Sequence, residues 1–222
     1  MARRFVFATD QYYHVFNRGI ARQPTFLTYT DYKQALLTLS YYLALHPPMK
    51  LSRWKELSMK LRDQVLERIY ENRDRHVDLI SFVLMPNHFH MLVKQHTDGG
   101  VTRFMNQFAN SYTRYFNTKR HRLGPLFQGI FKAVIIETIE QLLHVSRYIH
   151  LNPVVSHVIA EEELDRYPWS SFPQYLNRKS PFLDTLPVLS EFISPDAYRT
   201  FVHDQIDYGE TLEKVKHLCL DE

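Results

Sequence analysis

The chain has 222 residues, of which 45% are apolar and 23% charged, the ordinary balance of a globular protein with one large domain. No apolar run reaches the ~20 residues that a membrane-spanning helix needs. The first residues lack the sustained apolar segment of a signal peptide. The single cysteine, Cys219, excludes an internal disulfide and a cysteine-rich zinc site. These features favour a cytoplasmic protein.

The net charge of +3 hides an uneven distribution of charge along the chain. Residues 160–222 contain 13 acidic and 6 Lys or Arg residues, whereas residues 1–159 contain 11 and 21. Residues 99–136 have no Asp or Glu, which is typical of a surface that contacts a phosphate backbone. A solvated helix face beside a basic loop is the alternative. The residues that we expect to contact the phosphates of a nucleic acid are Arg18, Arg114, Lys119, Arg120, Arg122 and Lys132.

The spacing of apolar residues predicts the order of strands and helices. Gly19 ends the first strand, and Pro47 and Pro48 end the first helix. The predicted elements are a strand at 12–18, a helix from Thr30 or Asp31 to about His46, an additional helix within 51–73, strands at 77–84 and 88–95, a helix at 101–119, a strand at 131–137, and a helix capped by Thr138 and ended by Pro153.

This order predicts an α+β fold of the ferredoxin-like, RNA-recognition-motif-like type. Such a fold has an antiparallel sheet with helices on one face and an open face on the other, across which a nucleic acid can lie. We expect residues 1–158 to form one domain with a helical insertion at about 47–76. Residues 159–222, which are acidic and rich in Pro and aromatic residues, are expected to form a C-terminal extension that packs on this core.

Two histidines begin the third predicted strand. Side chains two apart on a strand point the same way, so His88 and His90 share a face with Leu92. Phe89, Met91 and Val93 form an apolar row on the opposite face, which is suited to a core. Two imidazoles that converge from one strand make half of a divalent metal site.

The last predicted helix of the core supplies a candidate for the other half. Tyr148 and Asn152 are four residues apart and therefore lie on one helix face. Because Asn152 precedes Pro153, we expect it at the end of the helix. An amide oxygen is an acceptable ligand for Mg²⁺ or Mn²⁺, although Asn before Pro is also a common helix stop.

Four ordered stretches resemble a known family. The run 84–90 resembles the His-hydrophobe-His signature of the HUH single-strand DNA endonucleases. The surrounding sequence resembles the single-tyrosine transposases of insertion sequences, and most closely the REP-associated tyrosine transposases. The supporting stretches are residues 14–19, 126–132 and 148–153, and the likeness covers roughly residues 10–155.

The resemblance implies that residues 1–158 are a catalytic domain with a specific reaction. The hydroxyl of Tyr148 would attack a phosphodiester of single-stranded DNA, leaving a 5′-phosphotyrosine and a free 3′-OH. His88, His90 and Asn152 would bind Mg²⁺ or Mn²⁺. The implied partner is single-stranded DNA that carries a hairpin formed by a palindromic repeat. Family members act as monomers or as homodimers, and the sequence leaves both open.

Other interpretations of these residues remain open. Tyr115, on the basic helix, competes with Tyr148 as the nucleophile, whereas Tyr112 falls in the apolar row and is expected in the core. His144 and His150 are expected on the helix surface, with His144 close enough to touch the site.

Two other functional classes are also compatible with the sequence. A non-catalytic module that binds single-stranded nucleic acid would present stacking aromatic residues on the open face. A metal-dependent hydrolase that activates water would need a carboxylate near the metal, for which Asp78 and Glu137 are the candidates.

Overall fold

The computed structural model describes residues 6–71, 74–176 and 180–205. Its centre is a four-stranded antiparallel sheet with the strand order β2-β3-β1-β4. This order is that of the ferredoxin-like fold, so the predicted fold class is confirmed. The strands are β1 (Tyr12–Arg18), β2 (Val77–Met85), β3 (His88–Gln95) and β4 (Lys132–Ile136).

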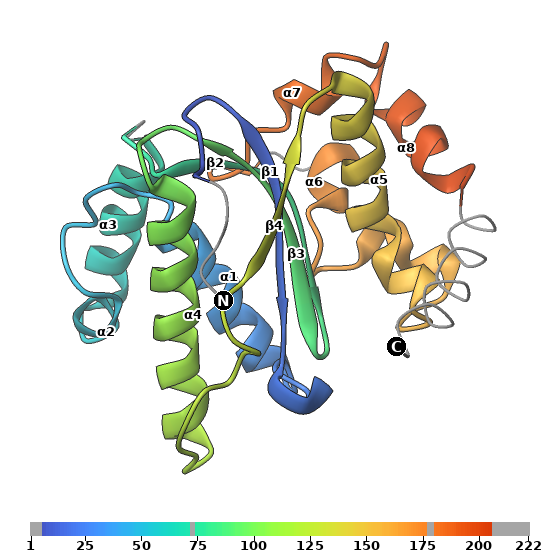
Figure 1. Ribbon diagram of the computed structural model, residues 1–222. Coiled ribbons are helices and arrows are strands. Elements are labelled where there is room, and N and C mark those ends of the chain that lie inside the picture. Colours follow the sequence, from blue (N-terminus) through green and yellow to red (C-terminus); the bar gives the residue numbers. More distant parts are fainter. Residues whose placement is uncertain (1–5, 72–73, 177–179, 206–222) are drawn as a thin grey trace.

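The helices divide between the two faces of the sheet (Figure 1). Helices α3 and α4 lie on one side of it in this view, and α5, α6 and α8 lie on the other. No helix in the described ranges is long and apolar enough to cross a membrane. The helices are η1 (Ile20–Arg22), α1 (Tyr29–Tyr41), α2 (Leu51–Trp54), α3 (Met59–Glu71), α4 (Gly100–Lys119), α5 (Ile139–Val155), η2 (Glu161–Arg166), α6 (Phe172–Leu176), α7 (Leu186–Leu189) and α8 (Pro195–His203).

Helices α1 and α4 pack on the first face and enclose the larger core. Strand alternation turns Phe89, Met91 and Val93 of β3 toward this core, as the sequence predicts. Phe89 is fully buried, and its ring meets those of Phe108 and Phe127 edge to face at centroid distances of 5.2 and 5.4 Å. Such packing fixes the rotation of β3, and therefore the direction of the histidines on its other face.

The second face of the sheet is only partly open. Helix α5 and the segments that follow it cover the part formed by β2 and β3, with Ile80, Val83 and Leu92 in a second apolar core. The segment after η2 also bonds along β2, where the Leu84 amide donates to the Trp169 carbonyl at 2.8 Å. The uncovered part of this face therefore lies along β1 and β4, where Lys132 and Val134 are exposed.

Four predictions about the helices were wrong. Helix α1 begins after Thr28, because Thr28 and Asp31 form a capping box that satisfies the first amides. It ends at Tyr41 and not near His46, because the backbone at 43–45 instead bonds to residues 74–76. The predicted additional helix is two helices, α2 and α3. Pro153 does not end α5 but lies within its last turn, where the missing N–H removes a single bond from the helix. Asn152 is therefore in the helix and not at its end.

A buried carboxylate joins α1 to the C-terminal end of α4. The Asp31 side chain is inaccessible to solvent and accepts hydrogen bonds from Lys119 and Arg120. The hydroxyl of Tyr115 donates to the same carboxylate at 3.0 Å. Burial opposes ionisation, but the hydrogen bonds from Arg120 and Lys119 hold the pKa of Asp31 well below its usual range.

We expect Asp31→Asn to lower the free energy of unfolding by about 2 kcal/mol at pH 7, because two cations lose a buried partner. The folded-state pKa of Asp31 is depressed, so its contribution is full above the unfolded-state pKa and is lost as the pH falls. The difference between wild type and variant should therefore shrink below about pH 4. Urea unfolding at several pH values measures it, with Asp63→Asn on the exposed face of α3 as control. A constant difference down to pH 2 contradicts the assignment.

Candidate active site

The turn between β2 and β3 places the first histidine. The carbonyl of Pro86 accepts the amides of Thr25 and Phe26 at 2.8 and 3.0 Å, and the Asn87 carbonyl accepts that of Gly19 at 2.7 Å. A Cβ at position 19 would collide with the Gln23 carbonyl, which explains the glycine there. The turn is thus fixed by the chain that follows β1.

Each histidine of β3 has a partner that orients its ring. Nδ1 of His88 lies 2.7 Å from the side-chain oxygen of Asn87. Nδ1 of His90 lies 2.9 Å from Nε2 of His14, and His90 is nearly buried. Hydrogen bonding at one ring nitrogen fixes the direction of the other, which is how proteins orient histidine ligands.

His14 was missed as a site residue. Strand β1 pairs with β3 so that Phe16 lies opposite His90, and His14 and Phe16 then share the face of the histidine pair. The ring centroid of His90 is 5.1 Å from that of His14 and 5.5 Å from that of Phe16. Alternation in residues 12–18 places His14 on this face of β1, but only the pairing of β1 with β3 shows that the two strands are neighbours.

Helix α5 brings Tyr148 and Asn152 to the same place. The side-chain oxygen of Asn152 lies 3.2 Å from Nε2 of His88. The Tyr148 ring is edge to face with that of His90, at a centroid distance of 5.3 Å and an interplanar angle of 86°. Asn152 is buried and Tyr148 is half-buried. The four residues that the sequence singled out, on two elements some sixty residues apart, therefore meet in one cluster.

The competing tyrosines lie elsewhere. Tyr112 is buried in the core beneath the other face of the sheet, where its hydroxyl donates to the Thr25 carbonyl at 2.7 Å and burial raises its pKa. Tyr115 donates to Asp31 and packs against the same core. Neither tyrosine lies on the face that carries His88 and His90.

The two remaining histidines of α5 differ from each other. His144 is exposed, as predicted, and its Nδ1 lies 2.6 Å from the guanidinium of Arg147. The prediction that His150 is a surface residue was wrong, because it is fully buried between α5 and the segments after it. Burial lowers the pKa of His150 to about 3, so its ring is neutral at physiological pH.

The six predicted phosphate contacts fall into two groups, of which the first lies beside the histidines. Arg18 is opposite His88 in the sheet register, is exposed, and donates from Nε to the side-chain oxygen of Gln128 at 2.6 Å. Lys132 is exposed opposite Phe16. These two cations flank the uncovered part of the face that carries the site.

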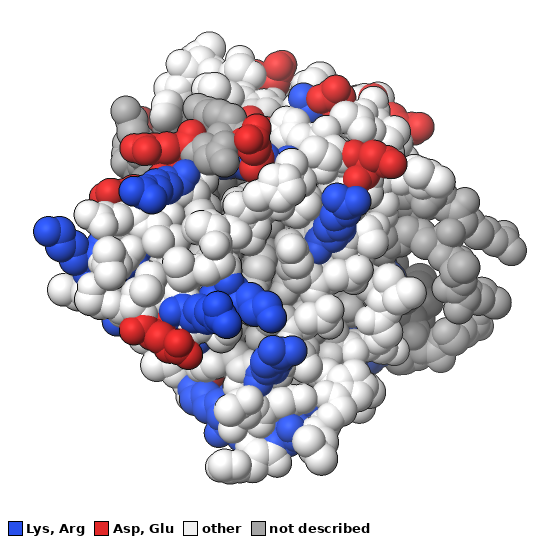
Figure 2. Space-filling view, turned by 90° about the vertical axis from the view of Figure 1, so that its left-hand side faces the viewer, with Lys and Arg blue, Asp and Glu red and all other residues white. Residues whose placement is uncertain are grey.

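The second group lies on α4 and the loop after it. Arg114 is exposed, whereas Lys119 and Arg120 are bound to Asp31. Arg122 donates to the side chain of Asn117 at 3.0 Å and to the Pro125 carbonyl at 2.8 Å. The side of the molecule that carries α3 and α4 in Figure 1 shows Lys and Arg across its middle and lower part and Asp and Glu mainly along its upper margin (Figure 2).

The two candidate carboxylates for a water-based reaction lie at the far end of the sheet. Asp78 is paired with Arg75 and His96 and lies opposite Lys94, whereas His88 lies opposite Met85. Glu137 follows β4 at the same distant end and is exposed. Within the described ranges, no cluster of three or more His, Cys, Asp or Glu side chains is arranged to bind a metal ion. The donor set at the site is thus two imidazoles and an amide.

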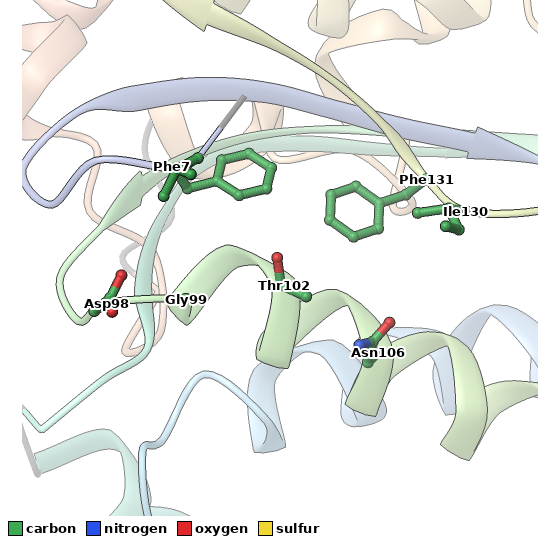
Figure 3. Close-up of a pocket in the computed structure, with 8 residues that line it drawn as sticks. Phe7, Asp98, Gly99, Thr102, Asn106, Ile130 and Phe131 are labelled. Atoms are coloured by element: carbon green, nitrogen blue, oxygen red, sulfur yellow. The ribbon is translucent and has the colours of Figure 1, made fainter. Parts of the chain in front are cut away.

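A cavity of about 320 Å³ lies apart from the histidine cluster (Figure 3). It opens between the N-terminal end of α4 and the segments that precede β1 and β4. None of the residues of the histidine cluster lines it. Its lining residues are Val6, Phe7, Asp98, Gly99, Thr102, Asn106, Ile130 and Phe131.

The resemblance to single-tyrosine transposases implies this arrangement. Two histidines lie on one strand of the sheet, and a helix that carries tyrosine and asparagine packs beside them. Residues 48–152, just under half of the chain, match the family model described as "Transposase IS200 like". The predicted resemblance is confirmed, and the chain is transposase-like in sequence. No curated protein matches the chain in sequence.

Solved structures share the fold. A REP-associated tyrosine transposase bound to a REP hairpin is 16% identical, with a TM-score of 0.51 over 83% of this chain and 92% of that one. At this identity the match shows a common fold. A candidate transposase from Deinococcus radiodurans is 11% identical, with 67% of this chain and 95% of that one covered, and its TM-score of 0.37 is too low to bear on the argument.

Proposed function

We propose that this protein is a single-stranded DNA endonuclease and strand transferase that uses Tyr148 as its nucleophile. The observation that carries the proposal is the meeting of Tyr148 and Asn152 of α5 with His88 and His90 of β3. A tyrosine used only for packing does not need two histidines and an asparagine beside it. The match to a transposase family model over residues 48–152 supports the same reaction class.

The reaction follows from the chemistry of a phenol and a phosphodiester. The oxygen of Tyr148 forms a bond to phosphorus, the bond from phosphorus to the 3′-oxygen breaks, and the phenolic proton is lost as the 3′-oxygen gains one. The 5′-phosphotyrosine keeps the energy of the broken bond, so that a 3′-OH of another strand can displace the tyrosine and rejoin DNA without ATP. Burial of Asn152 and His90 beside Tyr148 keeps the nucleophile in a defined position.

The donor atoms at this site suit a hard divalent cation. Nε2 of His88 and the side-chain oxygen of Asn152 approach to 3.2 Å, so both can contact one ion. Imidazole nitrogen and amide oxygen are ligands that Mg²⁺ and Mn²⁺ accept, and we propose that His88, His90 and Asn152 hold such an ion. When bound, the ion supplies positive charge to the phosphate oxygens.

We propose that the substrate is single-stranded DNA next to a hairpin. The solved relative named above is bound to a REP hairpin. In this chain the uncovered part of the face, along β1 and β4, is bordered by the exposed cations Arg18 and Lys132. A flexible single strand can follow such a strip, whereas Arg114, which is exposed on α4, is available to the hairpin stem.

Two alternatives remain for comparison. In a binding module, aromatic rings of the sheet would stack on bases, and Phe16 on β1 is such a ring. That function does not explain why Tyr148 and Asn152 face the histidines. A hydrolase would need a carboxylate that activates water, but Asp78 and Glu137 lie at the opposite end of the sheet.

Replacing Tyr148 by Phe tests the nucleophile. The substrate is a labelled single-stranded DNA hairpin from the flanks of the protein's own gene, and the reaction contains Mn²⁺. We expect the wild-type protein to form a covalent adduct with this DNA, and the Tyr148→Phe variant to form none. DNA affinity should change by no more than about twofold, because only a hydroxyl is removed. Denaturing gel electrophoresis detects the adduct.

Tyr115→Phe is the matched control, because it removes a hydroxyl bound to Asp31 on the other side of the sheet. It should leave adduct formation intact. Strand cleavage that survives in Tyr148→Phe without an adduct would instead identify a water-based hydrolase, and DNA binding without cleavage by wild type would identify a binding module.

Calorimetric titration with Mn²⁺ tests the metal ligands without any DNA. We expect His88→Ala and Asn152→Ala each to weaken Mn²⁺ binding at least about tenfold, since each removes a ligand. His144→Ala, which changes an exposed histidine of α5, should bind as wild type does. Equal Mn²⁺ affinity of His88→Ala and wild type would refute the assignment.

A further inference from the structure

A buried chain of polar side chains joins α5 to the segments after it. Nδ1 of His150 lies 2.7 Å from the Tyr198 hydroxyl, and Nε2 lies 2.7 Å from the Ser171 hydroxyl. The Tyr198 hydroxyl also donates to the Ser146 hydroxyl at 3.0 Å. All four residues are fully buried. A neutral imidazole has one donor and one acceptor nitrogen, so both are satisfied by these two hydroxyls.

The chain of contacts ends on β2. The amide of Phe82 donates to the Ser171 hydroxyl at 2.8 Å, and the Ser171 amide donates to the Phe82 carbonyl at 2.9 Å. His150 is therefore connected through Ser171 to the backbone of the sheet, and through Tyr198 to α8. These contacts connect α5 to the same sheet that carries His88 and His90.

The bonded residues lie on the side of α5 that faces away from the site. Ser146 and His150 are four residues apart and share one helix face. Tyr148 is two residues from each, which places it about 200° around the helix axis. A contact that prevents rotation of α5 about its axis therefore fixes the direction in which Tyr148 points.

We propose that Tyr198, His150, Ser171 and Ser146 are positioning residues that hold the nucleophile Tyr148 in its reactive direction. The inference rests on the proposed function. It gives Ser171 and Tyr198, which follow α5 in the chain, a part in the reaction that packing alone does not require. Apolar side chains would fill the same volume, whereas a hydrogen-bonded chain admits one rotation of α5.

The same segments also bind β2 by contacts that do not involve α5. The hydroxyl of Tyr175 donates to the Ile80 carbonyl at 3.0 Å and lies 2.9 Å from the Ser81 hydroxyl. The hydroxyl of Tyr167 donates to the Leu84 carbonyl at 3.1 Å. Mutation can therefore remove a hydroxyl that bonds these segments to β2 without removing a hydrogen bond to α5.

Two Tyr→Phe variants make the decisive comparison. Tyr198→Phe and Tyr175→Phe each remove one buried hydroxyl, but only the first removes a hydrogen bond to α5. The rate of covalent adduct formation is measured in single turnover with the labelled hairpin DNA at saturating protein and Mn²⁺. DNA affinity and urea unfolding are measured in parallel.

We expect Tyr198→Phe to form the adduct about tenfold more slowly at saturation, because a small misplacement of a nucleophile lowers the rate steeply. Its DNA affinity should stay within about twofold of wild type. Tyr175→Phe should react at the wild-type rate even if its stability is lowered as much. Ser146→Ala, which removes the end of the chain on α5, should slow the reaction in the same direction and provides the answer if Tyr198→Phe does not fold.

Two substitutions of His150 distinguish a role in positioning Tyr148 from a role in packing alone. His150→Phe should be slow, whereas His150→Gln, which keeps a donor and an acceptor, should recover part of the rate. Equal rates for Tyr198→Phe, Ser146→Ala and wild type overturn the inference and leave the proposed function intact. Absence of an adduct from wild type overturns the proposed function and this inference with it.

Discussion

The site depends on the alternation of side chains along β3. Because Phe89, Met91 and Val93 are buried in the core under α1 and α4, His88 and His90 must project from the opposite face. A shift of one residue in the pairing of β3 would exchange these two sets and bury the imidazoles without partners. The aromatic core under the sheet therefore determines on which face the two histidines lie, although it is on the opposite side of the sheet.

Helix α5 packs against the face of the sheet that carries the two histidines. One of its faces presents Tyr148 and Asn152 to the histidines, and another buries Ser146 and His150 against the segments after η2. Burial of polar groups is unfavourable unless they are hydrogen-bonded. These contacts account for both faces of the helix, so the helix has little freedom to turn between them.

Local pattern predicted the fold and most of the site. Alternation placed β1 and β3 at their observed bounds, and helical spacing joined Tyr148 to Asn152. Contacts between distant segments were not accessible to the same reasoning. The pairing of Lys119 with Asp31 joins residues 88 apart, and the burial of His150 depends on hydroxyls 21 and 48 residues further along the chain. The sequence alone does not show which distant residue a charged side chain or a histidine contacts in the folded protein.

The segments after α5 also determine from which side the histidine cluster is open. Backbone bonds from Trp169, Ser171 and Asp184 satisfy the edge of β2 from Leu84 back to Leu79. An edge strand satisfied in this way cannot pair with another chain. The open approach is then from β1 and β4, where Lys132 is exposed opposite Phe16. The same segments that bond to α5 therefore close the β2 side of this face and leave the β1 and β4 side open.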